Sequence, residues 1–414
     1  MIRWLIFILV IGVADYYAFQ SLKTVTKSNW WYALYWLFTV VVMGNFLIQF
    51  YGFNRSNGFS QANSLAVGFL IAMVVPKLVL IAIMFSEDIF RIPQGIYSYF
   101  MQDDSGSANQ IKHIPARRRF ISQIALGLAA VPFASILYGM YKGKYNFKVL
   151  KYTLHFEDLP KAFDGFRLTQ ISDVHSGSFD NMDKVSYAID LINEQQSDVV
   201  LFTGDMVNNK AEEMKPYVDI FKKLNAKEGL YSVLGNHDYG DYVRWNSDDD
   251  KKQNLEDLKA IQKEIGFDLL LNENRFIERD GERIAIIGVE NWGKGGFKKA
   301  GDLKKASSRV AKDDFKILLS HDPSHWDAEV VNDKNHYHLT LSGHTHGMQF
   351  GIEIPGWFKW SPVKWRYKQW AGIYESLGQY INVNRGFGYL AFPGRVGIWP
   401  EITVIELKKG SKEA

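Results

Sequence analysis

Four apolar stretches within the first 140 residues constrain this chain more than any other feature. They lie at residues 4–22, 30–51, 64–85 and 121–140. About 20 apolar residues are enough for a helix to cross the hydrocarbon core of a membrane. The second stretch has no charged residue, and aromatic residues gather at its start, as they do at a membrane interface. Four such stretches in succession favour a transmembrane bundle over residues 1–143 rather than the buried core helices of a soluble domain.

Two of these stretches carry a charge. Asp15 lies in the first and Lys77 in the third, each a little past the middle. Alternate spans cross a membrane in the same direction, so the two side chains can meet at similar depth. An unpaired charge there costs about 3 kcal/mol or more on insertion scales. We therefore expect a structural ion pair; a transport or proton-relay role is the weaker alternative.

Basic residues near the spans predict the orientation, because loops rich in Lys and Arg stay in the cytoplasm. The first loop and the segment between the third and fourth spans carry Lys23, Lys27, Arg91, Lys112, Arg117, Arg118 and Arg119. The opposite side has Arg3 and Arg55 near the spans. This pattern places the N-terminus, and everything after residue 141, outside the cytoplasm.

Residues 144–414 have the pattern of an α/β domain. Apolar runs of strand length lie at 166–171, 198–203, 230–234, 284–289, 315–319, 337–341, 380–383 and 402–407. Helical patterns cover 182–194, 212–224 and 254–265. Asp280-Gly281, within residues 269–289, predicts the turn of a β-hairpin. Helices between the early strands, followed by a strand-rich half, predict mixed sheets covered by helices.

Composition limits the chemistry of any site. The chain has no Cys, which excludes disulfides and thiolate ligands, so a metal must be held by His, Asp, Glu or Asn. A net charge of +3 is too small to indicate nucleic-acid binding. Nothing in the sequence indicates an obligate protein partner.

Five of the apolar runs end in residues that bind metals. The five ends read Ser172-Asp173-Val174-His175, Gly204-Asp205, Gly235-Asn236-His237-Asp238, Ser320-His321-Asp322 and Gly343-His344-Thr345-His346. Open α/β sheets place their ligand crevice at the carboxyl ends of strands. Oxygen and imidazole ligands suit two divalent ions, such as Mn, Fe, Zn, Co or Ni. Two ions about 3.5–4 Å apart activate a water for attack on phosphorus. The pattern therefore predicts hydrolysis at phosphorus.

These five blocks, in this order, resemble the calcineurin-like metallophosphoesterase superfamily over about residues 150–408. The resemblance implies a four-layer α/β/β/α sandwich with two mixed sheets. It implies one metal held by Asp173, His175 and His346, a second held by Asn236, His321 and His344, and Asp205 as the bridge. It also implies two catalytic residues that are not ligands. His237 would contact the phosphate and protonate the leaving oxygen, assisted by Asp238.

The opening at 166–177 and the tail at 384–402 are more similar to membrane-anchored bacterial members. Some of these cleave the pyrophosphate of UDP-2,3-diacylglucosamine, and others act on phospholipids. This closer resemblance implies a multi-pass protein of the bacterial inner (cell) membrane and a phosphorylated, lipid-linked substrate. One departure is Met348, where such relatives often have Gly. Its side chain either reshapes the substrate pocket or packs inward.

Residues 356–370 combine six aromatic and four basic residues. Such a mixture suits a membrane interface, where rings lie at headgroup depth and cations meet lipid phosphates. Our hypothesis is that this stretch rests on the bilayer and admits a lipid-linked phosphate ester; the alternative is that it covers a sheet edge as ordinary core. For the whole chain, the alternatives are a non-catalytic, metal-binding membrane sensor or scaffold and a phosphodiesterase with a soluble substrate.

Overall fold

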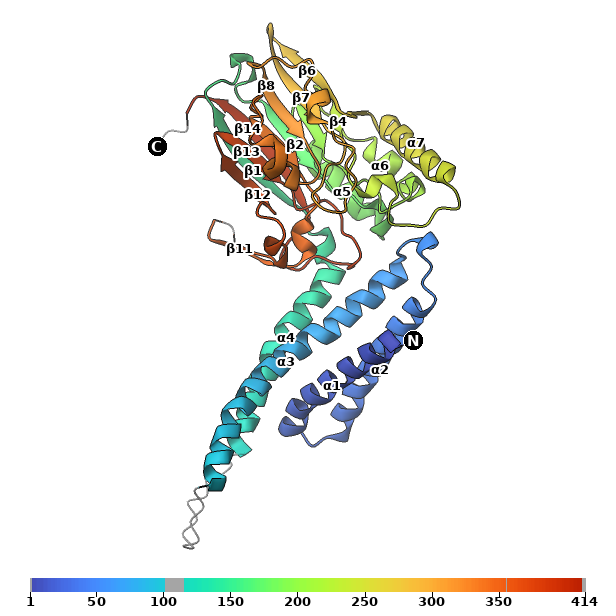
Figure 1. The fold of residues 1–414 in the computed structure, drawn as a ribbon, viewed down its shortest axis with the longest axis vertical. Helices are drawn as coiled ribbons and strands as arrows, with labels where there is room; N and C mark the ends of the chain where they lie inside the picture. Colours follow the sequence, from blue (N-terminus) through green and yellow to red (C-terminus); the bar gives the residue numbers. More distant parts are fainter. Residues whose placement is uncertain (1, 101–114, 355, 412–414) are drawn as a thin grey trace. The chain divides into compact units, whose positions relative to one another are not determined.

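The fold is taken from a computed structural model that describes residues 2–100, 115–354 and 356–411 (Figure 1). Lys112, one of the residues used to predict orientation, lies outside these ranges. The chain divides into two compact units. The first runs to Phe53 and continues over Ala62–Tyr138, and the second comprises Asn54–Gln61 and the chain from Gly139 onwards.

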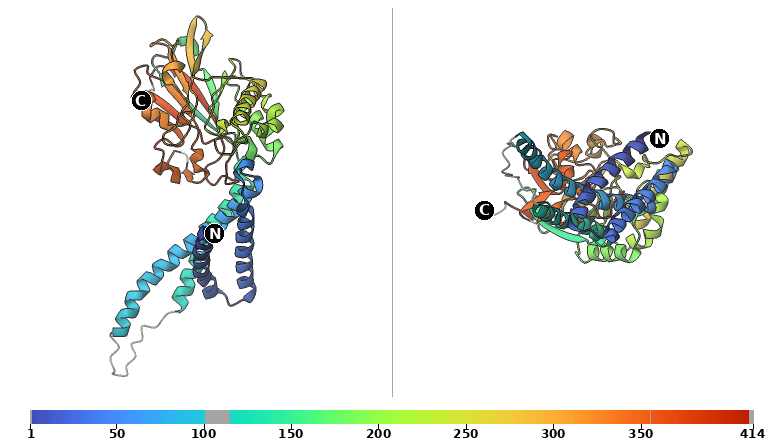
Figure 2. Two further views of the ribbon diagram at one scale, coloured as in Figure 1. Left: turned by 45° about the vertical axis from the view of Figure 1, so that its right-hand side comes forward. Right: turned by 90° about the horizontal axis from the view of Figure 1, so that it is seen from below.

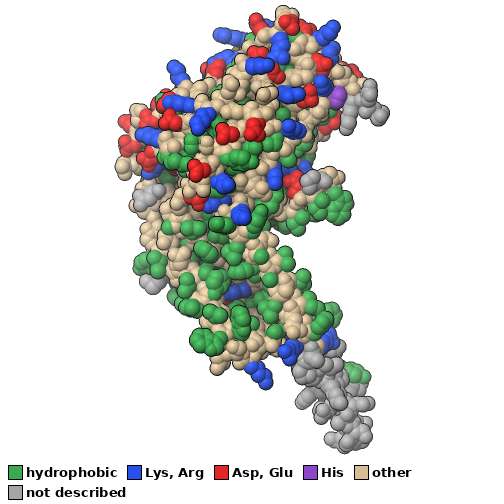
Figure 3. All heavy atoms as spheres, turned by 180° about the vertical axis from the view of Figure 1, so that it is seen from behind, with side chains coloured by type: hydrophobic (Ala, Val, Ile, Leu, Met, Phe, Trp, Pro, Cys, Tyr) green, Lys and Arg blue, Asp and Glu red, His purple; other side chains and the backbone are tan. Residues whose placement is uncertain are grey.

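The first unit consists of four long apolar helices, as the sequence predicts. They are α1 (Ile2–Val25), α2 (Asn29–Tyr51), α3 (Gln61–Phe100) and α4 (Pro115–Tyr141). Each is long and apolar enough to cross a membrane. Hydrophobic side chains dominate the surface of these helices in Figure 3, and charged side chains are sparse on it.

The predicted ion pair between alternate spans is confirmed. The ammonium of Lys77 on α3 lies 2.6 Å from Asp15 Oδ1 on α1, and both side chains are buried. Lys77 also donates to Thr39 Oγ1 on α2 at 2.8 Å. The pair therefore joins three helices, and each charge is compensated in a region where a lone charge is costly.

Helix α3 extends well beyond its predicted end at residue 85. The added turns carry Glu87 and Asp88, which face Arg118 at the start of α4 at 3.8 and 2.9 Å. In the left view of Figure 2, α3 and α4 diverge towards the C-terminal end of α3. Hydropathy predicts only the apolar part of a helix, so it does not reveal a polar extension held by ion pairs.

The second unit contains two six-stranded mixed sheets, which confirms the predicted fold class. The first has the order β1-β14-β2-β3-β4-β5 and the second the order β12-β13-β9-β8-β7-β6. The first comprises β1 (Lys148–Phe156), β2 (Arg167–Ile171), β3 (Val199–Phe202), β4 (Leu230–Ser232), β5 (Phe267–Leu269) and β14 (Glu401–Lys409). The second comprises β6 (Glu273–Arg279), β7 (Glu282–Gly288), β8 (Phe315–Leu319), β9 (Leu339–Ser342), β12 (Gly372–Ser376) and β13 (Gln379–Val383).

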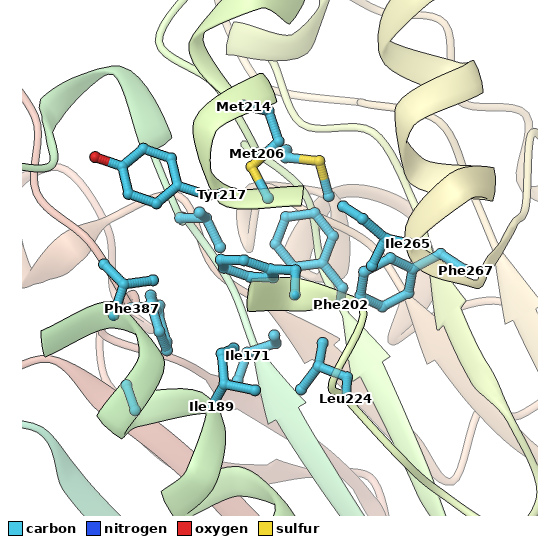
Figure 4. Close-up of a cluster of buried hydrophobic side chains, with 14 of the residues drawn as sticks. Ile171, Ile189, Phe202, Met206, Met214, Tyr217, Leu224, Ile265, Phe267 and Phe387 are labelled. Atoms are coloured by element: carbon cyan, nitrogen blue, oxygen red, sulfur yellow. The ribbon is translucent and has the colours of Figure 1, made fainter. Parts of the chain in front are cut away.

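The cores follow from the alternation of side chains along each strand. On β3, Val199 and Leu201 enter the core between the two sheets, whereas Val200 and Phe202 enter the core beneath the helices. That outer core lies under α5 (Met182–Asn193), α6 (Val218–Phe221) and α7 (Asp248–Ile265) (Figure 4). A third core, beneath α8 (Leu303–Ala306), covers the outer face of the second sheet. The result is a four-layer α/β/β/α sandwich.

Two local predictions meet different outcomes. The hairpin is confirmed, since Asp280 (φ 51°) and Gly281 (φ 80°) form the turn between β6 and β7 with the positive φ values of a type I′ turn. The helix predicted over 212–224 is wrong in extent. It breaks into 3₁₀ turns before α6, because Pro216 lacks an N–H and disfavours helical geometry in the residue before it.

Candidate metal centre

The parallel strands β2, β3, β4, β8 and β9 bring their carboxyl ends to one edge of the sandwich. All seven predicted ligands follow these ends, and each is buried or nearly so. Close packing requires glycine beside them. A Cβ on Gly343 would lie 1.8 Å from Ser172 Oγ and 2.3 Å from Asp173 Oδ2. The chain therefore approaches the ligands at a distance that only glycine permits.

A first cluster contains Asp173, His175 and His346, three of the predicted ligands. The Nε2 atoms of His175 and His346 face each other at 3.0 Å. His346 Nε2 also lies 3.2 Å from Asp173 Oδ1. All three side chains are buried.

A second cluster contains Asp205, His321 and His344. His344 Nδ1 lies 2.7 Å from Asn236 Oδ1 and 3.3 Å from His321 Nε2, so the predicted amide ligand belongs to the same group. Asp205 adjoins both clusters, because its Oδ2 lies 3.1 Å from His321 Nε2 and 3.6 Å from His175 Nε2. This is the position that a bridging carboxylate requires.

The chemistry of these groups fits two divalent cations. His321 Nδ1–H donates to the Thr203 carbonyl at 2.7 Å, so Nε2 is the ring nitrogen that faces the Asp205 carboxylate, at 3.1 Å. Buried carboxylates and imidazole lone pairs directed at one another are unfavourable unless a cation lies among them. Nitrogen and oxygen atoms without thiolate suit the metals expected from the sequence.

The charges of this site shift its acid–base equilibria strongly. Burial lowers the pKa of His175 well below its ordinary value, and the neighbouring His346 lowers it further. Burial also disfavours the charged form of His321, but the adjacent Asp205 carboxylate outweighs it and raises the pKa to about 10. For Asp205, burial is outweighed by His321 and His237, and the pKa is well below its usual range. The site therefore favours ionised carboxylates around a positive charge.

His237 lies beside the two clusters with a defined orientation. Its Nδ1–H donates to the Asn208 carbonyl at 2.7 Å, which leaves Nε2 as the exchangeable ring position. The ring packs on Tyr242, with 4.3 Å between centroids, and meets the His175 ring edge-on at 4.9 Å. Burial lowers its pKa.

Asp238 has surroundings different from those expected. Its carboxylate accepts the backbone N–H groups of Gly235, Asp205 and Met206 at 2.8 to 2.9 Å. The Asn208 carbonyl is the partner of His237 Nδ1. The assistance of His237 by Asp238 therefore stays a prediction, and the contacts of Asp238 hold the turns that carry Asp205 and Asn236.

Three nearby side chains have no predicted role. The hydroxyl of Tyr367 lies 2.8 Å from His344 Nε2, and Asp322 Oδ2 lies 3.4 Å from the same atom. The Tyr242 hydroxyl accepts from Asn236 Nδ2 at 2.8 Å. Asp322 was detectable, because it directly follows His321. Tyr242 lies six residues after Asn236, and Tyr367 lies in the segment after β11; no spacing in the sequence indicates that either contacts the site.

Comparisons with known proteins agree with this fold and site. A family model described as calcineurin-like phosphoesterase matches residues 166–348, and one described as probable calcineurin-like phosphoesterase, transmembrane domain, matches residues 2–144. The chain is 30% identical over 299 residues to the uncharacterized metallophosphoesterase YkuE of Bacillus subtilis, covering 71% of this chain and 98% of the relative.

Two further relatives differ in how much they share. An uncharacterized metallophosphoesterase of Helicobacter pylori is 24% identical over 413 residues, 97% of each chain. A transmembrane protein with metallophosphoesterase domain of Danio rerio is 27% identical over 281 residues, 66% of this chain and 60% of the relative.

The sandwich and its paired His/Asp clusters thus define a metal-dependent phosphoester hydrolase. The chain belongs to the calcineurin-like metallophosphoesterase family, in a form with an N-terminal region of four transmembrane helices.

Proposed function

We propose that this chain is a two-metal phosphohydrolase anchored by residues 1–143 that acts on a lipid-linked substrate. The observation that carries the two-metal centre is the position of Asp205 Oδ2 between His175 and His321. Asp173, His175 and His346 would hold one divalent ion, Asn236, His321 and His344 the other, and Asp205 both. When bound, two such ions activate water and stabilise charge on a phosphoryl group.

The protein's own contribution to bond cleavage comes from His237. Because Nδ1–H is engaged by the Asn208 carbonyl, Nε2 is the ring atom that can contact a phosphate oxygen. Once Nε2 has taken up a proton, it can pass that proton to the leaving oxygen. Packing of the ring on Tyr242 keeps Nε2 in one direction. The Asp238 carboxylate accepts hydrogen bonds from backbone N–H groups of the turns that carry Asp205 and Asn236.

Replacement of His237 by Asn tests this role. We expect turnover of a generic phosphodiester to fall about 10²- to 10⁴-fold, the usual contribution of a proton-transfer group. Both metals should remain bound, because no ligand is removed. Metal content is measured by elemental analysis of the same preparation. Full turnover with two metals bound would refute the role of His237, and a metal-loaded wild type inert on a broad panel of phosphoesters would favour a sensor or scaffold.

The lipid-linked substrate is supported by the apolar surface of one hairpin. Strands β10 (Ile352–Ile354) and β11 (Phe358–Trp360) pair with each other and join neither large sheet. Ile352, Trp357 and Phe358 are 56%, 80% and 47% exposed. Exposed apolar groups gathered in this way are typical of surfaces that meet a membrane or a partner. By contrast, Tyr367 and Trp370 of the following segment are buried in a small core.

A double replacement of Trp357 and Phe358 by Ser tests the lipid-linked substrate. We expect hydrolysis of a phosphoester presented in vesicles or mixed micelles to fall at least severalfold, and that of a soluble phosphodiester to be retained. Leu377→Ser is the matched control, since Leu377 is 69% exposed in the turn between β12 and β13. An equal effect of the double replacement on both substrates would favour the soluble-substrate alternative.

If the domain lies outside the cytoplasm, as the basic loops predict, the substrates available to it are phospholipids, undecaprenyl-type phosphates or other phosphodiesters of the cell envelope. A UDP-2,3-diacylglucosamine-type substrate would require the cytoplasmic side. The choice among them depends on orientation.

A further inference from the structure

Two loops from distant parts of the chain converge on His344. The loop at 291–301 brings Phe297, whose ring meets the His344 ring edge-on with 4.7 Å between centroids. The segment at 361–370 brings Tyr367, whose hydroxyl lies 2.8 Å from His344 Nε2. The first loop is fixed beside the site at Gly293, where a Cβ would lie 2.5 Å from Asp322 Oδ2. The surroundings of His344 are therefore built from both loops.

The guanidinium of Arg366 lies over the rings that these loops supply. Its central carbon is 5.1 Å from the centroid of Phe297 and 5.5 Å from that of Tyr367. Stacking on two rings orients a planar cation without neutralising it. Arg366 is exposed, and no carboxylate lies within ion-pair distance of it in the described parts of the chain.

This cation differs from the other arginines near the sheet edges. Arg385, for example, is buried and paired with Glu401 at 2.6 Å and with Glu353 at 2.5 Å. Arg395 is buried and donates to backbone carbonyls, including that of Arg385 at 2.6 Å. Both of these have structural partners. Arg366 instead presents an oriented, uncompensated charge next to two rings that touch a predicted metal ligand.

We infer that Arg366 binds a second anionic group of the substrate, adjacent to the phosphate held at the metal centre. The inference rests on the proposed function and narrows its substrate class. The planar fork of guanidinium donors suits a phosphate oxygen pair. A phosphoester that carries another phosphate next to the scissile one, as a pyrophosphate does, would engage both the metals and Arg366.

The test compares two substrates with the same alkyl chain and the same 4-nitrophenyl group, and it follows the loss of intact substrate, which counts cleavage at either phosphorus. One is a phosphodiester with a single charge, and the other is the corresponding pyrophosphate with two. In full-length, metal-loaded protein, Arg366→Ala should raise KM for the pyrophosphate about tenfold while its kcat and the KM for the diester change less than twofold. Arg366→Lys keeps the charge without the planar fork and should recover only part of the loss. Lys364→Ala and Lys368→Ala, which remove neighbouring exposed cations, should leave the ratio of the two KM values as it is in wild type.

The outcomes separate the two proposals. Equal changes in KM for both substrates, or none for either, would overturn the inference for Arg366 and leave hydrolysis by the metal centre intact. Elemental analysis and the melting temperature of Arg366→Ala exclude loss of metal or of fold as the cause. Failure of the metal-loaded wild type to hydrolyse either substrate would instead overturn the proposed function, and the inference with it.

Discussion

Backbone strain is concentrated in the residues of the metal centre. Asp173, His175, Asp205, His344 and His346 all have φ between 46° and 71°, in the left-handed region. For residues with a Cβ this conformation costs roughly 1–2 kcal/mol each. Their side chains converge because the chain turns sharply at each strand end. The surrounding fold sustains that strain, as is common at functional sites. The residue types were readable from the sequence, but the left-handed turns that aim them were not.

Met348 shows the same conformation without a ligand role. It has φ 55° and ψ 14°, and its side chain is 56% exposed. The alternative that this side chain packs inward is therefore wrong. Replacing it by Gly should relieve the backbone strain. The gain is partly offset by the larger conformational entropy of Gly in the unfolded chain. We expect a net stabilisation of about 0.5–1 kcal/mol, measured as a rise of about 1–3 °C in melting temperature in detergent.

Met348→Ala is the control for this prediction. Alanine removes most of the side chain but keeps the Cβ that disfavours positive φ, so the melting temperature should stay close to that of wild type. If Ala and Gly raised it equally, the effect would come from the exposed side chain, and the strain argument would be contradicted.

At the scale of elements, the buried strands were predictable and the edges were not. Strands β2, β3 and β8 are short apolar runs that end in polar turns, and the structure places them within one or two residues of the prediction. Strand β1 was missed, because it lies at a sheet edge and its residues are only partly buried. Its partner is β14, at the far end of the chain. No local sequence pattern predicts that β1 pairs with a strand more than 240 residues away.

The same limit explains which parts of the site were missed. Asp and His residues that directly follow apolar strands can be recognised in the sequence as candidate ligands, because parallel strands bring them to one edge of the sheet. Tyr242, Tyr367 and Arg366 lie on loops whose paths depend on long-range packing. The composition of residues 356–370 is unusual, but it does not indicate which of the aromatic residues are exposed and which are buried. Trp357 is exposed on a hairpin, whereas Trp370 is core.

At the scale of the whole molecule, one segment between helices belongs to the catalytic unit. Residues 54–61, between α2 and α3, contact that unit directly: Gln61 donates to the Phe179 carbonyl at 3.0 Å, and the Arg244 N–H donates to the Arg55 carbonyl at 3.3 Å. If all four helices cross the membrane, two spans separate this segment from the residues after α4. Residues 54–61 and the residues after α4 must then lie on the same side of the membrane. The predicted orientation places them on the same side as well.

The absence of Cys makes this orientation directly testable. Single Cys replacements at Ser28, Ser60 and Ser411 report the loop between α1 and α2, the loop between α2 and α3, and the end of β14. Ser60 and Ser411 are exposed, and Ser28 is partly exposed. Because Lys and Arg concentrate in the loops on the Ser28 side, the positive-inside rule predicts that this side is cytoplasmic. A membrane-impermeant maleimide should therefore label Ser60→Cys and Ser411→Cys in intact cells, and Ser28→Cys only after permeabilisation; the Cys-free parent controls for background.

Labelling of Ser28→Cys alone would place the metal centre in the cytoplasm and shift the candidate substrates to precursors of the inner leaflet. Labelling of Ser60→Cys and Ser411→Cys on different sides would contradict the four-span arrangement itself.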